Sequence, residues 1–109
     1  MRVLTFLRSP TVACVLAAAS AMAGAQPAAA PLALRSLAAT CAQCHGTDGR
    51  PVPGSLVPAL AGRPADDTAR QMQAFRSGSA SGTVMPQLAK GYSEAQVRSL
   101  AAYFAAQPR

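Results

Sequence analysis

The sequence contains no tryptophan and only one histidine, and its other aromatic residues are few. Of the 109 residues, three are Phe and two are Tyr, while Ala supplies much of the apolar half. Because alanine buries little surface and aromatic side chains bury the most, this composition predicts a thin hydrophobic core. The length allows one domain, which excludes a multidomain enzyme and a dinucleotide-binding fold with its own substrate domain. Something besides side-chain packing must help to hold this chain together.

Acidic residues are also scarce, with four Asp or Glu against ten Lys or Arg and a formal net charge of +6. The basic residues are scattered along the chain and are not interleaved with aromatic residues, as they would be on many nucleic-acid-binding surfaces. We therefore expect these charges to lie on a solvated surface, and we expect no nucleic-acid partner.

The sequence lacks a long hydrophobic run, and its N-terminal apolar stretch is short. Two arginines precede an alanine-rich stretch that ends in Ala23-Gly24-Ala25, and this order is typical of a cleavable secretory signal peptide. We expect residues 1–25 to be the signal, cut after Ala25 or after Ala23, and the mature chain to be periplasmic without a stable membrane span. An uncleaved membrane anchor is the alternative, but the 17-residue stretch from Ser9 is shorter than the about 20 apolar residues that a spanning helix needs.

The rest of the chain shows helical periodicity and no alternating strand pattern of useful length. We expect residues 26–31 to be an Ala/Pro tether and residues 32–107 to form the folded domain. Apolar residues at helical spacing predict three helices, over 32–44, 64–77 and 93–107. The expected fold class is therefore all-α.

Two segments rich in glycine, proline or serine, residues 46–63 and 78–91, separate the three expected helices and predict long loops. Gly78 is a stop signal for the middle helix. Ser93 and Gln96 have the spacing of a capping box at the start of the last helix. Loops this long are unusual in so small a domain unless they pack against something.

The residues with distinctive chemistry are concentrated in Cys41-Ala42-Gln43-Cys44-His45. C-x-x-C-H is the attachment signature of c-type haem. Two thiols three positions apart on a helical turn can reach the two vinyl groups of a porphyrin, and the adjacent histidine can offer its imidazole to the iron. We therefore expect one covalently attached haem c with its iron. Attachment of this kind takes place outside the cytoplasm, which agrees with the expected signal peptide.

Two other interpretations of the cysteine pair are weaker. A redox-active disulfide between Cys41 and Cys44 would require a βαβ context, which this sequence lacks. A zinc site would need a fourth ligand near the cluster, but His45 is the only histidine, and Asp48 alone is a poor completion.

The second axial ligand of the iron follows from elimination. No second histidine exists, and Met/His ligation is the usual pairing in electron-transfer haem proteins. Met85, in the loop Thr83-Val84-Met85-Pro86, is favoured over Met72, whose position on a helical face suits a core residue. Pro86 would hold the backbone at Met85 in an extended conformation. An open iron or one bound by Lys90 is the remaining alternative.

These residues resemble class I c-type cytochromes, the small one-haem electron carriers of the periplasm. The resemblance extends over residues 32–107 and is closest to the cytochrome c4/c553 group and to the cytochrome subunit of flavocytochrome c sulfide dehydrogenase. The motifs that carry the resemblance are Cys41-Ala42-Gln43-Cys44-His45-Gly46, Val57-Pro58-Ala59-Leu60-Ala61-Gly62, Thr83-Val84-Met85-Pro86 and Leu100-Ala101-Ala102-Tyr103-Phe104.

The resemblance implies a small cytochrome c fold whose loops wrap one haem, with thioether bonds to Cys41 and Cys44 and with His45 and Met85 as axial ligands. It also implies that the Pro58 carbonyl accepts a hydrogen bond from the other ring nitrogen of His45, and that Leu60 packs on the haem. Tyr103 and Phe104 would lie where the two terminal helices cross. Because no tryptophan is present to bind a haem propionate, the candidates for that task are Arg50, Lys90 and Tyr92.

The function expected from these features is single-electron transfer in the periplasm between a donor and an acceptor protein. One alternative is a haem-bearing subunit docked permanently on a flavoprotein sulfide dehydrogenase. A haem peroxidase is a weaker alternative, because it needs an open iron position and a nearby acid–base group, and no second histidine is present. Because the porphyrin would supply the missing apolar bulk, we also expect the haem-free chain to be largely unfolded.

Overall fold

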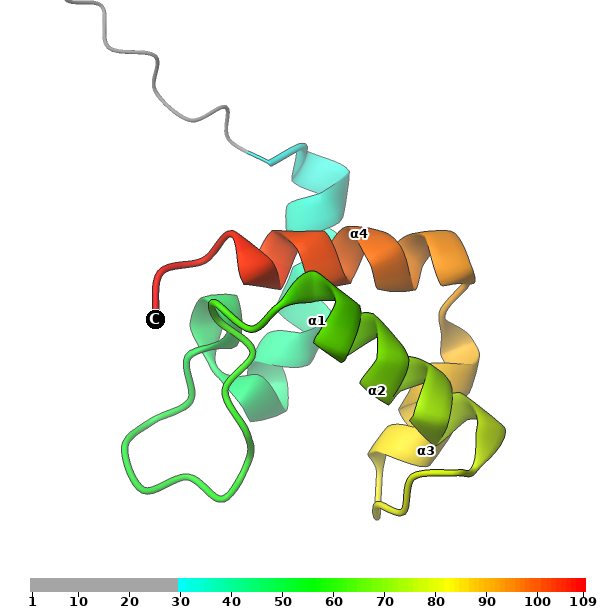
Figure 1. The fold of residues 1–109 in the computed structure, drawn as a ribbon. Coiled ribbons are helices and arrows are strands. Elements are labelled where there is room, and N and C mark those ends of the chain that lie inside the picture. The colour runs from blue at the N-terminus through cyan, green and yellow to red at the C-terminus, as the bar shows by residue number, and fades with distance from the viewer. Residues whose placement is uncertain (1–29) are drawn as a thin grey trace, which may run out of the picture.

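The computed structural model describes residues 30–109, and the helices it contains are those of an all-α domain (Figure 1). No strand occurs within this range. The expected signal peptide lies outside the described residues, as do residues 26–29 of the expected tether. The elements in chain order are α1 (Leu32–His45), η1 (Thr47–Gly49), α2 (Ala65–Ser77), α3 (Met85–Leu88), η2 (Ala89–Gly91) and α4 (Glu94–Ala105). None of the helices in residues 30–109 combines the length and the hydropathy needed to cross a membrane.

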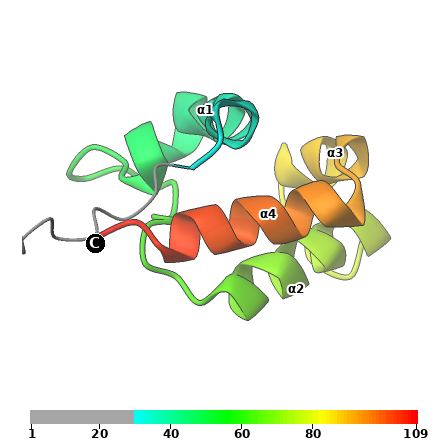
Figure 2. The ribbon, with the colours of Figure 1, turned by 90° about the horizontal axis from the view of Figure 1, so that it is seen from above.

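Helix α4 lies between α1 and α2, and α3 lies near its start (Figure 2). The buried cluster consists of Ala38 from α1 with Leu100 and Phe104 from α4. Phe104 is only 2% exposed and is the largest fully buried side chain in the described range. The core is therefore as thin as the composition predicts, and it marks the place where the two terminal helices cross.

The helix ends follow the local sequence signals closely. Ser93 and Gln96 form the expected capping box of α4, with the Ser93 hydroxyl accepting from the Gln96 N–H at 3.2 Å and the Gln96 side chain accepting from the Ser93 N–H at 2.9 Å. Gly78 ends α2 in the left-handed conformation, with φ of 82°. Helix α2 begins at Ala65, one residue later than expected, because Pro64 is the N-cap rather than the first helical residue.

The second expected loop is not wholly a loop, and this part of the sequence analysis was wrong. Residues 85–91 form α3 and η2, and Met85 is the first residue of α3 instead of an extended residue before Pro86. Proline in the first helical turn is compatible with a helix because the N–H it lacks has no partner there. The Val84 carbonyl accepts from the N–H groups of Gln87 and Leu88 at 3.0 and 3.1 Å, which closes this short turn.

The first expected loop is tied back to the core at both ends. The Gly49 carbonyl accepts hydrogen bonds from the N–H groups of Leu60 and Ala61 at 2.8 and 3.1 Å. The Gly62 N–H donates to the Phe104 carbonyl at 2.9 Å, which joins the loop to α4. These bonds bring the two ends of the loop 50–59 together, and they fix the segment around Pro58 against the end of α1.

Candidate haem-binding site

A cavity of about 440 Å³ lies between the end of α1, the loop around Pro58, α2, α3 and α4. It is lined by every site residue that the sequence predicts: Cys41, Cys44, His45, Pro58, Leu60 and Met85. Many of the other lining residues are apolar, among them Leu56, Val57, Met72, Phe75, Val84, Leu88, Val97, Leu100 and Phe104. The chain therefore brings two thiols, an imidazole and two thioethers to one largely apolar space.

His45 is the last residue of α1 and is 9% exposed. Its Nδ1 lies 2.8 Å from the Pro58 carbonyl oxygen. Because a carbonyl oxygen can only accept, Nδ1 carries the proton and donates it to this bond. The lone pair of a neutral imidazole is then on Nε2, and this ring nitrogen can bind a metal.

The two cysteines lie on the final turn of α1, three positions apart, and both line the cavity. Cys41 is half-buried and packs against the core, whereas Cys44 is exposed. Burial raises the pKa of the Cys41 thiol above its ordinary value, although a hydrogen bond from Thr40 partly opposes this shift. A raised pKa keeps Cys41 protonated at neutral pH, which is unlike the low-pKa thiolate of a redox-active C-x-x-C pair.

Both methionines of the described range line the cavity, so the structure places Met72 there as well as Met85. Met85 begins the four-residue α3, while Met72 belongs to the middle of the long helix α2. Both side chains are half-buried.

The three residues considered for a haem propionate lie in different places. Tyr92 lines the cavity, and its hydroxyl is 2.9 Å from the Thr40 hydroxyl. Arg50 does not line it and donates instead to the Pro108 carbonyl at 2.9 Å. Lys90 is exposed on η2 and does not line it either.

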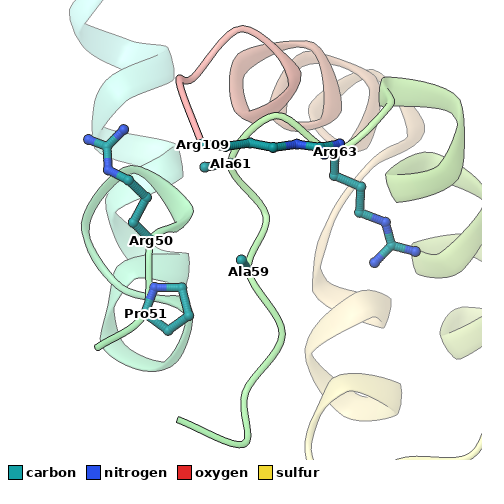
Figure 3. Close-up of a pocket in the computed structure, with 6 residues that line it drawn as sticks. All are labelled: Arg50, Pro51, Ala59, Ala61, Arg63 and Arg109. Atoms are coloured by element: carbon teal, nitrogen blue, oxygen red, sulfur yellow. The ribbon is translucent and has the colours of Figure 1, made fainter. Parts of the chain in front are cut away.

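Three polar residues that the sequence analysis did not single out also line the cavity: Arg63, Thr68 and Gln71. Arg63 additionally lines a neighbouring depression with Arg50 and Arg109 (Figure 3). The side chains of these three arginines point in different directions in that view and do not converge on one point. The helical spacing of Thr68 and Gln71 puts these two residues on one face of α2, but nothing in the sequence shows that this face borders a cavity.

The residues present fit a c-type haem. The donor set supports the fit, because the thiols of Cys41 and Cys44, the imidazole of His45 and a methionine thioether meet in one largely apolar cavity. Within residues 30–109, no three His, Cys, Asp or Glu side chains come together as a metal-binding cluster.

Comparison with known families agrees with this geometry. The family described as cytochrome c oxidase, cbb3-type, subunit III matches residues 28–104. The chain belongs to this cytochrome c family. Cytochromes c of this kind carry electrons, so the function of this chain is electron transfer. Membership of the family implies haem c as the cofactor.

Three curated relatives are similar over about 70 residues. The chain is 42% identical to the thiosulfate dehydrogenase electron acceptor of Thiomonas intermedia (strain K12), over 62% of this chain and 31% of that protein. It is 37% identical to the cytochrome subunit of sulfide dehydrogenase of Chlorobaculum tepidum, over 62% of this chain and 60% of that protein. It is 34% identical to cytochrome c-554(548) of Halomonas halodenitrificans, over 62% of this chain and 84% of that protein. The chain thus spans about a third of the first relative and three fifths of the second.

Proposed function

We propose that this cytochrome c is a periplasmic single-electron carrier with one covalently attached haem. His45 and Met85 are the proposed axial ligands of the haem iron. The observation that carries the proposal is the orientation of His45. The buried imidazole donates through Nδ1 to Pro58 at 2.8 Å, which leaves Nε2 as the metal-binding atom beside the Cys41–Cys44 pair. A hydrogen bond of this kind fixes the ring and increases its basicity.

When bound, a c-type haem supplies an iron that alternates between Fe(II) and Fe(III). Cys41 and Cys44 would hold it by thioether bonds at the end of α1, and the His45 imidazole would bind its iron. The apolar residues around the cavity, Leu60 among them, exclude water. With His45 and Met85 both bound to the iron, a substrate would have no access to the metal, which favours a carrier over a peroxidase.

Met85 is the proposed second axial ligand because of the element that bears it. Helix α3 is one turn long and follows a loop, so it can adjust to place the thioether sulfur on the iron. Met72 is fixed by a 13-residue helix that packs on α4. A thioether ligand raises the reduction potential relative to a second imidazole.

The axial assignment is tested with the oxidised haem-bearing protein and two matched variants. Met85→Ala should abolish the weak far-red absorption band that reports sulfur–iron ligation and should lower the reduction potential, because the iron loses its thioether ligand. Met72→Ala removes the same side chain from the same cavity and should keep the band. Loss of the band in Met72→Ala alone would overturn the assignment.

We further propose that the partner is a sulfur-compound dehydrogenase, because relatives are a thiosulfate dehydrogenase electron acceptor and a sulfide dehydrogenase cytochrome subunit. If the protein diffuses freely, the rate at which a purified thiosulfate dehydrogenase reduces it should rise in proportion to the concentration of the carrier. Co-elution with a flavoprotein from the native host would instead favour the permanently docked subunit. Export is tested separately, since removal of residues 1–25 leaves Gln26 as the N-terminus of the periplasmic protein.

A further inference from the structure

A depression of about 530 Å³ lies at the foot of the loop 50–59, beside the cavity proposed for haem (Figure 3). Of the described residues, three arginines and no acidic residue line it: Arg50, Arg63 and Arg109, with Pro51, Ala59 and Ala61. A surface with three positive charges and no negative one favours an acidic partner. The three side chains do not converge on one point in Figure 3, so they suit carboxylates spread over a surface better than one small anion.

Two of these arginines are held in place by backbone carbonyl groups. Arg50 Nη1 donates to the Pro108 carbonyl at 2.9 Å, and Arg109 Nε and Nη2 donate to the Gly62 carbonyl at 3.2 and 2.9 Å. Because a carbonyl group has no formal charge, these bonds orient the guanidinium groups without neutralising them. Asp48 lies 3.4 Å from Arg50, whereas no carboxylate in the described part of the chain forms an ion pair with Arg109. Side chains that are already ordered lose less conformational entropy when a partner binds.

The loop beside the depression exposes apolar side chains. Residues 51–62 contain no charged residue, and the loop that they form projects from the helices (Figure 1). The Ser55 N–H donates to the Val52 carbonyl at 3.1 Å, which closes the tip of the loop as a turn. Val52 is 75% exposed, and Leu56 is fully exposed. Exposed apolar side chains next to arginines are typical of a protein–protein interface.

The position of the loop favours a protein over a lipid membrane as the partner. Leu56 lines the cavity as well as being exposed, and Arg63 lines both the cavity and the depression. A partner that binds here would therefore lie beside the haem. An electron carrier must bring its haem close to the redox centre of another protein, and a lipid bilayer contains no such centre.

We propose that the arginine surface, defined as Arg50, Arg63 and Arg109 with the loop residues Val52 and Leu56, is the docking surface for an acidic face of the redox partner. This inference rests on the proposed function, because it assumes a haem in the neighbouring cavity. Carboxylates of the partner bind the guanidinium groups, and an apolar contact between them receives the tip of the loop. Charge attraction of this kind steers the encounter and weakens as salt is added.

The charges are tested by titrating the reduced, haem-bearing protein with a short synthetic peptide of glutamates around one leucine, followed by NMR of the backbone amides. The largest shifts should fall in the loop and at Arg109. Arg50→Gln/Arg109→Gln should weaken binding severalfold at low salt, because two of the positive charges are lost. Arg76→Gln/Arg98→Gln removes the same charge from exposed positions of α2 and α4 outside the depression, and should weaken binding much less. Arg63 is left unchanged because it also borders the cavity.

The apolar tip is tested with the same peptide. Val52→Ser should weaken its binding, because the leucine of the peptide loses its apolar contact, but should leave binding of a peptide of glutamates alone unchanged. Leu32→Ser is the matched control, since Leu32 is 77% exposed at the start of α1 and lies outside both the cavity and the depression.

Equal affinities of the two arginine double variants, or amide shifts centred on other arginines, would overturn the proposal. Two further probes test other occupants. Inorganic sulfate that gives the same shifts at a lower concentration than the peptide would indicate a small-anion site. Sedimentation with phosphatidylglycerol vesicles, without binding of the peptide, would indicate contact with a membrane. Either result would overturn the assignment to an acidic protein face.

Failure of the proposed function is recognised by separate measurements. The mass of the protein reports haem attachment, and a wild-type protein without haem would refute the proposed function itself. With purified thiosulfate dehydrogenase as the electron donor, Arg50→Gln/Arg109→Gln should be reduced more slowly than Arg76→Gln/Arg98→Gln, and the difference should disappear at high salt. No reduction of the wild type by this donor would refute the proposed partner, whereas equal rates in the two double variants would refute only the docking surface.

Discussion

Asp48 and Tyr103 join the turn after the C-x-x-C-H motif to the last helix. Asp48 adopts a left-handed backbone with φ of 53° and accepts a hydrogen bond from the Tyr103 hydroxyl at 2.6 Å. Since a net hydrogen bond to a charged group contributes about 1.5–3 kcal/mol and this pair is partly exposed, Tyr103→Phe should lower the free energy of unfolding by about 1 kcal/mol. Denaturant titration measures the loss, and a double-mutant cycle with Asp48→Asn isolates the pair.

The same contact predicts a dependence of stability on alkaline pH. The hydrogen bond to Asp48, with help from burial and the negative charge, raises the pKa of Tyr103 above its ordinary value. The folded state therefore holds this proton more tightly than the unfolded state does. The contribution is complete below the unfolded pKa of about 10 and is lost as the pH rises through the folded value. Tyr103→Phe should remove this loss above about pH 10, and an unchanged pH profile would contradict the assignment.

Gly49 is a residue at which the backbone tolerates little change. Its φ is 79°, and an added Cβ would lie 2.8 Å from the Ala61 nitrogen and from the Leu60 Cβ, and 2.9 Å from the Phe104 ring. Gly49→Ala should therefore cost about 3 kcal/mol or more, from backbone strain and overpacking together. Gly54 has a similar φ of 83° but has no atom within 4 Å of the added carbon, so Gly54→Ala should cost only about 1–2 kcal/mol. If thermal or denaturant unfolding shows equal losses of stability in Gly49→Ala and Gly54→Ala, contact of the added carbon with the core is unimportant and the prediction is wrong.

At the scale of the elements, the N-cap of α4 makes a measurable contribution. Ser93→Ala removes the hydroxyl that accepts from the Gln96 N–H and should destabilise the haem-bearing protein by about 1 kcal/mol. Ser99→Ala is the control, because Ser99 is exposed in the middle of the same helix. The prediction fails if the two variants unfold at the same denaturant concentration.

The helices also show which parts of the fold could be predicted from the sequence. The three long helices could be predicted because each has regular apolar spacing and a local stop or start signal, such as Gly78 or Ser93. Helix α3 could not, because one turn has no periodicity and Pro86 resembles a loop signal. Thr68 was missed for a related reason. A single threonine on a helix has no pattern that shows whether it lines a cavity, and that depends on how α2 packs against the rest of the fold.

At the scale of the whole molecule, the proposed haem would supply apolar bulk that the side chains do not provide. Buried hydrophobic residues within the described range are four alanines, Leu100 and Phe104. So few large apolar side chains leave little to offset the conformational entropy of folding. A Cys41→Ala/Cys44→Ala variant, which lacks both thiols proposed to attach the haem, should show little helical circular dichroism and no cooperative thermal transition. Cooperative unfolding of this variant would contradict the prediction.

The burial of His45 bears on the order of events during biogenesis. In the folded domain the imidazole is enclosed and tied to Pro58, beside the half-buried Cys41. An enzyme that joins porphyrin to thiols needs both cysteines in reach, and a collapsed domain would deny it that access. If the chain stays unfolded until the haem is attached, the enzyme can reach both cysteines. The loop around Pro58 would then close only after attachment. A variant whose loop closes more slowly should remain accessible to the enzyme for longer. A variant whose haem-free domain is more stable should be converted to haem-bearing protein in lower yield.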